Sequence, residues 1–510
     1  MSVLVTAAEM RAFDRHTIDV IGVPGAVLME TAGHAVAEVV RSLEPARVLV
    51  VCGVGNNGGD GCVAARWLHG WGLEVRLVLV GAVNRVHGDA ALHLHAAQRA
   101  GVPLVELDDL GAIDAAFGPS LPDTVLVDAL LGTGLGRPVE GLFAEVIDRI
   151  NEEPGVKVAV DVPSGLDSDR GVPLGSCVRA DRTVTFGFCK RGLAVAPGFT
   201  FAGRVDVVDI GIPVALARGC KTVLLEAEVL RPFSGALGPL GHKGTHGHLL
   251  LLAGSPGKSG AAALAGRAAL RCGAGLCTVA ADKAALAAMM AVSATPELMT
   301  LALAGGLDAE LASLEAALDG KRALAIGPGL STSGETGQLV SRLVQAALSR
   351  ALPLVLDADG LNHLATNPQL LTDGATNRRI VVLTPHPGEA ARLLGRSIAD
   401  VQADRVASAL ELAATYGAVV ALKGARTLVA APDGRLAVCP TGNAGLGTGG
   451  TGDVLTGCIG ALLLQGSDGF EAATAGVYLH GAAGDLVAAR SGQRGLLASD
   501  VIEALPQVLR

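Results

Sequence analysis

The stretch VLVVCGVGNNGGDG, residues 48–61, decides the fold class of this chain. It begins as a continuous apolar run, typical of a strand buried on both faces, and passes through glycines into the helix-like run CVAARWL. A strand joined to a helix in this way is the repeating unit of a parallel α/β sheet. Similar strand-like runs follow at 74–81, 124–130, 156–163 and 182–188. We therefore predict a Rossmann-like, three-layer αβα domain.

The glycines of this stretch match a dinucleotide-binding fingerprint, but the next strand does not. Gly53-x-Gly55-x-x-Gly58 follows a strand and precedes a helix, as that fingerprint requires. In such a fold an acidic residue at the tip of the following strand holds the ribose. Strand 74–81 ends without one. The sequence therefore argues against an ordinary NAD-dependent dehydrogenase.

Polar side chains instead follow three of the predicted strands. Asn56, Asn57 and Asp60 follow the first, Asp128 ends another, and Asp161 ends a third with Ser164 close behind. The carboxyl ends of parallel strands form the ligand crevice of an open sheet. Amide and carboxylate oxygens suit hard cations, and free backbone N–H groups suit phosphate. We predict a ligand site here; the alternative is that these residues only cap helices.

A second α/β domain is predicted after a break in the pattern. Residues 210–245 are rich in glycine and proline and show no clear periodicity, which indicates a domain boundary. We place the two domains at 1–214 and 222–510. In the second, alternation resumes with strand-like runs at 248–255, 277–281, 323–329, 352–360, 379–389 and 418–425.

The stretch GNAGLGTGGTGDVLTG, residues 442–457, combines dense glycine with one carboxylate, Asp453, at the start of a helix-like run. Glycines before a helix let backbone N–H groups converge on one point, and the helix dipole adds positive potential there. Such a cradle suits a phosphoryl group in transfer, and no Gly-Lys-Ser/Thr of a Walker loop follows. Asp453 can accept a proton from an attacking hydroxyl. The alternative is an ordinary N-cap aspartate.

Other polar residues of the second half also stand at strand ends. LKGART provides Lys423 and Arg426, and LDADGL, residues 356–361, adds carboxylates. TPHPGE places His386 between prolines, which exclude a helical His-x-x-Glu metal pair. Together these features favour a nucleotide-dependent enzyme.

Composition bounds the partners and the compartment. The chain has 510 residues, a net charge of −9 and no basic run of the kind that binds nucleic acid or membranes. Nine scattered cysteines without a CxxC pair indicate a reducing compartment. The charged N-terminus does not resemble a signal peptide, and no apolar run approaches a membrane span. We expect a cytoplasmic homo-oligomer that binds small molecules and neither nucleic acid nor membranes.

The N-terminal half resembles the NAD(P)H-hydrate epimerases. The resemblance rests on four motifs in the order of that family: residues 6–40, GNNGGDGCVAARWL, DALLGTGLGRPVEG and DVPSGLDSDRG. It implies binding of a hydrated nicotinamide cofactor, NADHX or NADPHX. Asp161 would contact the hydrated ring and catalyse epimerisation, and Asn57, Asp128 and Ser164 would hold K⁺. The implied hydrate-binding residues are Asn56, Asn57, Gly58, Gly59, Asp60, Gly132, Thr133, Gly134, Leu135, Gly136, Arg137, Pro138 and Asp161.

The C-terminal half resembles the ribokinase-like fold and, more closely, the ADP/ATP-dependent NAD(P)H-hydrate dehydratases. AIGPGL, DADGLN, TPHPGE, KGART and GTGGTGD occur in the order of that family. The resemblance implies that Gly329, His386 and Asp453 contact the hydrate, with Asp453 as the catalytic base and Mg²⁺ accompanying ADP or ATP. The implied nucleotide-binding residues are Lys423, Gly424, Ala425, Arg426, Thr427 and Gly452.

The two resemblances together predict a bifunctional repair enzyme, an isomerase and a lyase. The second domain would phosphorylate the hydroxyl of the S-hydrate, and loss of phosphate would restore the ring double bond. One alternative is a ribokinase-like kinase of a small alcohol with a non-catalytic N-terminal domain. Another is a binding protein that keeps both folds without catalysis, against which the acidic residues in both halves argue.

Overall fold

The computed structural model describes residues 1–235, 239–293, 295–372 and 379–510. They form two compact units: an N-terminal unit, Val3–Thr222, and a C-terminal unit, Val223–Arg510 together with Met1–Ser2. The chain passes from one to the other within β10 (Thr222–Leu224). Among the described residues, no helix combines the length and the hydrophobicity needed to cross a membrane.

The N-terminal unit is built on a seven-stranded sheet in which every pair of neighbours is parallel. The strand order is β4 (Leu104–Leu107), β3 (Glu74–Val80), β2 (Arg47–Cys52), β5 (Thr124–Ala129), β6 (Val156–Val160), β7 (Arg182–Phe186) and β9 (Arg204–Val208). Because β2, β5 and β6 are neighbours, the loops that follow them meet at one edge of the sheet. Outside this sheet, β1 (Ser2–Val5) pairs in parallel with β8 (Cys189–Lys190). The predicted strands are confirmed.

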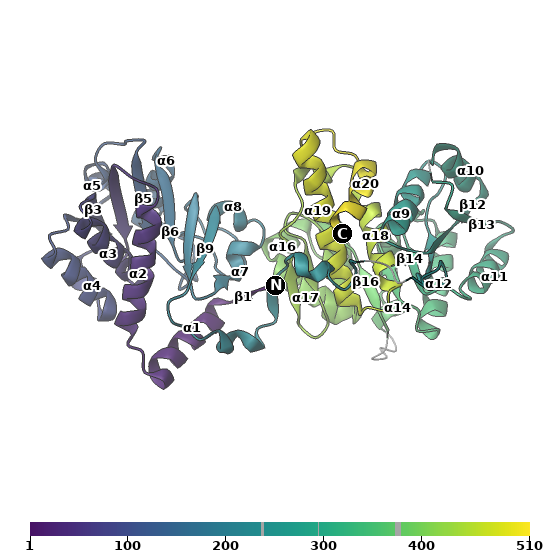
Figure 1. Ribbon diagram of the computed structural model, residues 1–510, viewed down its shortest axis with the longest axis horizontal. Helices are drawn as coiled ribbons and strands as arrows, with labels where there is room; N and C mark the ends of the chain where they lie inside the picture. Colours follow the sequence, from purple (N-terminus) through teal and green to yellow (C-terminus); the bar gives the residue numbers. More distant parts are fainter. Residues whose placement is uncertain (236–238, 294, 373–378) are drawn as a thin grey trace. The chain divides into compact units, whose positions relative to one another are not determined.

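Helices cover both faces of this sheet because successive strand residues point to opposite sides. Val48 and Val50 of β2 pack with α2, α3 and α4, whereas Leu49 and Val51 pack with α5 and α6. Figure 1 shows these helices around the strands of the unit. The helices of the unit are α1 (Ala7–Arg15), α2 (Gly25–Arg41), α3 (Asn56–Gly70), α4 (Gly88–Arg99), α5 (Ile113–Phe117), α6 (Leu142–Glu152), α7 (Arg191–Ala194) and α8 (Phe199–Ala202). The expected three-layer arrangement is therefore present.

The C-terminal unit has a larger sheet that is parallel from β13 to β17 and ends in an antiparallel hairpin. Its order is β13 (Met299–Leu303), β12 (Leu276–Asp282), β11 (His248–Leu252), β14 (Ala323–Ile326), β15 (Leu354–Leu356), β16 (Val381–Leu383), β17 (Val419–Leu422), β18 (Leu428–Ala430) and β19 (Leu436–Val438). The turn between β17 and β18 carries the KGART motif.

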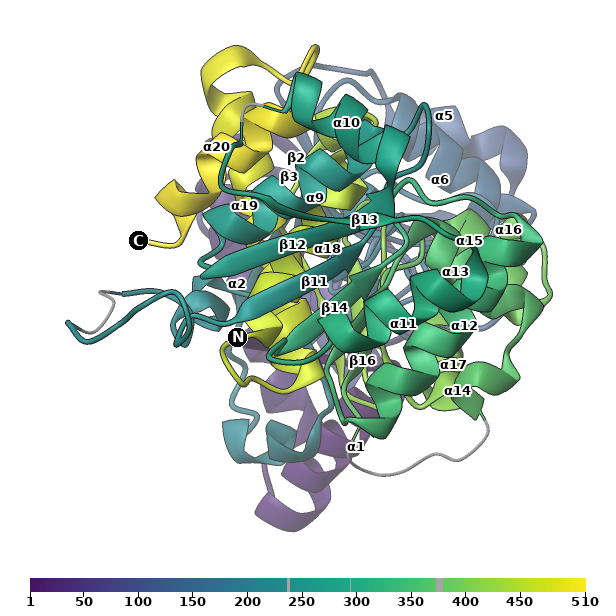
Figure 2. The same ribbon diagram turned by 90° about the vertical axis from the view of Figure 1, so that its right-hand side faces the viewer.

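Two groups of helices enclose this second sheet (Figure 2). One face packs against α9 (Ser259–Arg271), α18 (Thr451–Leu463), α19 (Gly469–Ser491) and α20 (Ala498–Val508). The other carries α11 (Leu307–Ala317), α12 (Gly334–Ser349), α13 (Ala358–Thr366) and α17 (Arg405–Tyr416). The remaining helices are α10 (Lys283–Val292), α14 (Gln369–Thr372), α15 (Pro387–Leu394) and α16 (Ile398–Ala403). Alanines and glycines of α9 and α18 allow close contact; a Cβ on Gly457 would overlap the carbonyl oxygen of Ala265.

Candidate active sites

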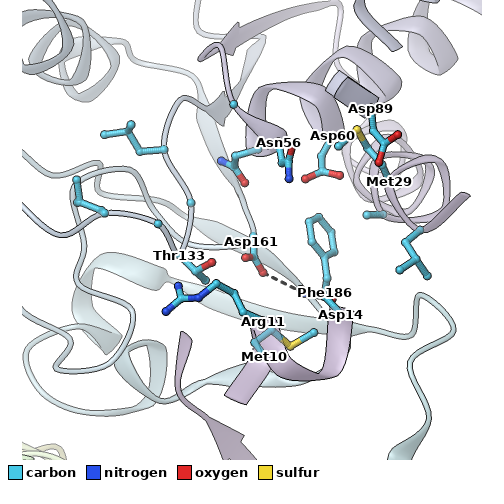
Figure 3. Close-up of a pocket in the computed structure, with 18 of the residues that line it drawn as sticks. Met10, Arg11, Asp14, Met29, Asn56, Asp60, Asp89, Thr133, Asp161 and Phe186 are labelled. Atoms are coloured by element: carbon cyan, nitrogen blue, oxygen red, sulfur yellow. Dashed lines mark hydrogen bonds between the residues drawn. The ribbon is translucent and has the colours of Figure 1, made fainter. Parts of the chain in front are cut away.

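The N-terminal unit holds a cavity of about 680 Å³ at the carboxyl ends of its central strands (Figure 3). Its wall is formed largely by the loops after β2 and β5, the end of β6 and the helix α1. Gly58, Gly59 and Pro138 are not part of this wall. The predicted binding residues that do line it are Asn56, Asn57, Asp60, Gly132, Thr133, Gly134, Leu135, Gly136, Arg137 and Asp161.

The glycines of the first loop are required by close backbone approach. A Cβ on Gly58 would overlap the carbonyl oxygen of Gly53, and a Cβ on Gly53 would overlap that of Leu130. The helix α3 has Gly55 at its N-cap, with no side chain capping it. Asn56 and Asn57 therefore do not cap α3, and the capping alternative fails for them.

Asp161 is held in a strained backbone conformation beside a buried lysine. Its φ of 64° lies in the left-handed region, which non-glycine residues rarely occupy outside functional sites. One carboxylate oxygen, Oδ1, accepts hydrogen bonds from Lys190 Nζ at 2.5 Å and Thr185 Oγ1 at 3.0 Å. The ammonium of Lys190 also donates to the carbonyl oxygen of Phe186 at 2.8 Å, and the lysine side chain is 1% exposed. These donors all reach Oδ1, so Oδ2 is the oxygen left to face the cavity.

Asp128 and Ser164 are joined by two hydrogen bonds. Ser164 donates to the carboxylate of Asp128 from its backbone N–H at 2.8 Å and from Oγ at 2.5 Å. Burial raises the pKa of Asp128 to about 6, even though the bonds from Ser164 lower it. The buried amide Nδ2 of Asn57 has no hydrogen-bond partner among the described residues. The three predicted K⁺ ligands thus offer oxygens from three neighbouring strand ends.

Asp453 lies in the first turn of α18 and is not its cap. The N-cap is Gly450, with φ of 93° and no side-chain hydrogen bond. Burial and, to a smaller extent, the charge of Asp357 raise the pKa of Asp453 to about 7, although Lys423 lowers it. A carboxyl with this pKa is suited to take up a proton at neutral pH. The N-cap alternative is therefore wrong, and the geometry favours the base.

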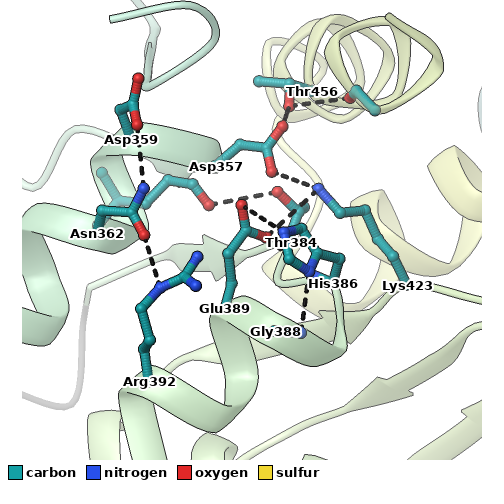
Figure 4. A network of polar contacts seen from close by, with 12 residues as sticks. Asp357, Asp359, Asn362, Thr384, His386, Gly388, Glu389, Arg392, Lys423 and Thr456 are labelled. Atoms are coloured by element: carbon teal, nitrogen blue, oxygen red, sulfur yellow. Dashed lines mark hydrogen bonds and ion pairs between the residues drawn. The ribbon is translucent and has the colours of Figure 1, made fainter. Parts of the chain in front are cut away.

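A buried polar network supports this end of the sheet (Figure 4). Lys423 Nζ lies 2.5 Å from Asp357 Oδ1 and 3.9 Å from Glu389 Oε2. The other oxygen of Asp357 accepts from Thr456 Oγ1 of α18 at 2.6 Å. Burial lowers the pKa of Lys423, but the two carboxylates raise it more, so the net shift is upward. The ammonium of Lys423 is thus held as a cation beside the glycine-rich loop. It lies 3.5 Å from the position that a Cβ atom on Gly452 would occupy.

His386 is the N-cap of the helix α15. Its Nδ1 accepts a hydrogen bond from the backbone N–H of Gly388 at 2.9 Å, and its own backbone N–H donates to Glu389 Oε2 at 2.7 Å. This reciprocal capping box fixes both side chains at the start of α15, with Pro387 in its first turn, so the prolines do not keep this segment out of a helix. Glu389 therefore links His386 to Lys423.

The remaining predicted residues occupy two tight turns. Gly424 (φ 138°) and Arg426 (φ 54°) bend the turn after β17, and Thr427 Oγ1 donates to the carbonyl oxygen of Gly424 at 3.0 Å, with Ala425 between them. Gly329 (φ 61°) follows β14, and its carbonyl oxygen accepts from Ser255 Oγ at 2.8 Å. Gly329 lies against the GSPGKSG loop, because a Cβ there would meet Lys258.

Comparisons with known proteins match the N-terminal and C-terminal parts of the chain to two different family models. Residues 249–507 match the family model described as NAD(P)H-hydrate dehydratase, and residues 25–192 match that of the YjeF-related protein N-terminus. The chain is 43% identical to the bifunctional NAD(P)H-hydrate repair enzyme Nnr of Moorella thermoacetica, over 99% of this chain and 96% of that protein. The chain belongs to the family of bifunctional NAD(P)H-hydrate repair enzymes.

Solved structures similar to this member of the repair-enzyme family cover its C-terminal unit. A ribokinase-like superfamily protein from Enterococcus faecalis V583 is 25% identical, with a TM-score of 0.50, over 57% of this chain and 95% of that one. The expected ribokinase-like fold is thereby confirmed. The ADP/ATP-dependent NAD(P)H-hydrate dehydratase from Bacillus subtilis, co-crystallized with ATP/Mg²⁺, is 34% identical over 56% of this chain and 96% of that one, with a TM-score of 0.48.

Sequence reasoning missed several polar residues of this repair-family protein. Lys190 follows β7 in a short run, FCKRG, that has no recognisable motif. Asp14 lies on α1, far from the strand ends in sequence, yet lines the cavity. Asp357, Glu389 and Thr456 stand inside quoted motifs, but no role was assigned to them. The one signal that could have identified Lys190 is the presence of a lysine within a buried, apolar stretch.

Proposed function

We propose that this chain repairs hydrated nicotinamide cofactors in two steps. The N-terminal unit interconverts the R- and S-hydrates of NADH and NADPH, and the C-terminal unit dehydrates the S-hydrate at the expense of ADP or ATP. The observation that carries the proposal is Asp453, a half-buried carboxyl with a pKa of about 7 that stands in the first turn of α18, beside Lys423 and the glycine-rich helix start, without capping the helix. Such a set of groups fits proton removal coupled to phosphoryl transfer.

In the C-terminal unit, Asp453 takes the proton of the hydrate's hydroxyl as its oxygen attacks phosphorus. The backbone N–H groups at the start of α18 stabilise the transferred phosphoryl group, and Lys423 supplies a fixed positive charge. Phosphate then leaves, which is easier than loss of hydroxide, and the ring double bond returns. Gly329 and His386 contact the hydrate. The nucleotide is bound by Lys423, Gly424, Ala425, Arg426, Thr427 and Gly452.

Mg²⁺ is proposed to accompany the nucleotide phosphates. Both oxygens of Asp357 are already engaged by Lys423 and Thr456, so the phosphates are the natural ligands and we assign no protein side chain to the ion. A bound Mg²⁺ would neutralise charge on the phosphates during transfer.

In the N-terminal unit, the cavity residues named above hold the hydrate, and Asp161 stabilises the positive charge that develops when the hydroxyl leaves the carbon beside the ring nitrogen. K⁺ is proposed to bind Asn57, Asp128 and Ser164. The residues fit the ion, because all three carry side-chain oxygens at the ends of neighbouring strands, and Asp128 and Ser164 are buried there.

The wider properties of the chain are proposed on the same basis. We place the epimerase domain at 1–214 and the dehydratase domain at 222–510, and we propose a homo-oligomer. None of the nine cysteines, all of them among the described residues, forms a disulfide, which supports a cytoplasmic setting. Similarity over the whole chain to bifunctional repair enzymes does not favour the alternative of a kinase for a small alcohol.

Recovery of reduced cofactor tests the proposal. The full chain is given a mixture of both hydrate epimers with Mg²⁺, K⁺ and either ADP or ATP, and the near-ultraviolet absorbance of the reduced nicotinamide ring is followed. Complete recovery faster than spontaneous epimerisation is expected. Recovery of the S share alone would refute the epimerase, and no recovery with either nucleotide would refute the repair function.

A further inference from the structure

Four aspartates line the N-terminal cavity, Asp14, Asp60, Asp89 and Asp161, and two of them, Asp60 and Asp161, have contrasting surroundings. Asp161 comes from the end of β6, and Asp60 comes from α3 on another side of the same space (Figure 3). Asp161 is ion-paired with Lys190. Pairs of acids whose environments differ in this way commonly divide the roles of acid and base between them.

Asp60 lacks the support that Asp161 has. In the part of the chain that the structure describes, no hydrogen bond to the carboxyl of Asp60 is present, and the side chain of Met29 lines the same cavity (Figure 3). Burial raises the pKa of Asp60 well above its ordinary value, and the charge of Asp161 raises it further. Of the other ionisable groups, Lys190 lowers its pKa and Asp14 and Cys62 raise it, and Asp89 and Arg11 line the same cavity. The cation that acts on Asp60 is itself paired with Asp161.

We propose that Asp60 is the general acid of the epimerisation and that Asp161 is its partner base on the other side of the ring. This assignment rests on the proposed epimerase function. Asp60 gives its proton to the departing hydroxyl, the bond between carbon and oxygen breaks, and water leaves. The lone pair of the ring nitrogen forms the double bond of an iminium-like cation.

The reaction closes by addition of water from the opposite side. The oxygen of that water bonds to the cationic carbon, its electrons neutralise the iminium, and one proton passes to the free Oδ2 of Asp161. Asp60 has then lost one proton and Asp161 has gained one, and exchange with solvent restores both. Lys190 acts as a positioning residue, since it occupies Oδ1 and leaves only Oδ2 to react.

The variant Asp60→Asn tests the acid in the full chain, with Asp19→Asn as the matched control because Asp19 is exposed on the segment next to α1 and outside the cavity wall. Consumption of the R-hydrate is measured against consumption of the S-hydrate, which needs only the C-terminal unit. We expect Asp60→Asn to slow R-hydrate conversion by about 100-fold or more, with S-hydrate conversion and the KM for hydrate within a few-fold of wild type. The control should be unchanged.

Two results would overturn the assignment. One is conversion of the R-hydrate by the Asp60→Asn variant at the wild-type rate. The other is a wild-type epimerase rate that does not fall on the alkaline side of its pH profile, since Asp60 must be protonated to act as an acid. The pH measurement stands even if the substitution unfolds the unit. A wild-type chain that never converts the R-hydrate would instead refute the epimerase itself.

Discussion

Dehydration of the S-hydrate should rise with pH through about 7, because Asp453 must be ionised to take up a proton. With a pKa of about 7, about a tenth of this carboxyl is ionised at pH 6 and about nine tenths at pH 8. The rate should therefore rise by about tenfold between these values. The groups that face Asp453 and set this pKa are Asp357, which raises it, and Lys423, which lowers it.

The variant Asp453→Asn removes the base while keeping the shape of the side chain. The loss of a positioned general base costs about 100- to 10,000-fold in rate. The assay is recovery of reduced cofactor from pure S-hydrate with saturating nucleotide, across the pH range, with nucleotide binding measured separately by calorimetry. The matched control is Asp308→Asn, an exposed aspartate in the first turn of α11. A variant that binds both ligands and still dehydrates within a few-fold of wild type would refute the reasoning, as would a wild-type profile without the rise.

Three further outcomes are expected. Lys190→Met should abolish epimerisation and lower the stability of the N-terminal unit by about 3–5 kcal/mol, because it leaves the carboxylate of Asp161 without its buried partner. Denaturant unfolding measures the stability and R-hydrate consumption measures the epimerisation. Unchanged epimerisation would contradict the prediction. Gly58→Ala should destabilise the same unit, since the new Cβ would overlap the carbonyl oxygen of Gly53. Gly70→Ala in the same helix is the control, because a Cβ there has open space and should be tolerated. Equal melting temperatures for the two variants would show that the close approach of Gly58 to Gly53 is unimportant. Asp128→Asn should remove the K⁺ dependence of epimerisation. In the wild type, K⁺ affinity should fall as pH drops through about 6, because the Asp128 carboxyl becomes protonated there and loses its charge. A K⁺ titration at several pH values measures both, and a variant that still depends on K⁺ or a wild-type affinity that does not change with pH would contradict the prediction.

The buried strands and the glycine loops were predictable from the sequence because their signal is local. A strand covered on both faces must be largely apolar, as the runs 48–52 of β2 and 125–127 of β5 are, and a loop that approaches another backbone closely must use glycine. Among the strands that escaped prediction, β4, β9 and β13 lie at the edges of their sheets and are partly exposed. A half-exposed strand of four or five residues with charged or exposed positions carries too little pattern to be distinguished from a loop.

Residue types at strand ends located both candidate sites, but only the tertiary structure decided how those residues act. The sequence placed Asp161 and Asp453 beside their loops and left open whether each was a helix cap. The fold excluded capping for Asp453 by putting Gly450 at the N-cap, and it brought Lys423 and Asp357 next to the acid from distant strands.

The role of Lys190 and the contrast between Asp60 and Asp161 could not be predicted from the sequence, because they too depend on contacts between distant segments. Burial and the nearest charges set the ionisation of a carboxyl, and both come from segments that are far apart in the chain. Local pattern therefore determined the parallel sheets, the glycine turns and the family resemblance. Long-range packing alone determined which acids are paired, which stand alone, and which can give or take a proton.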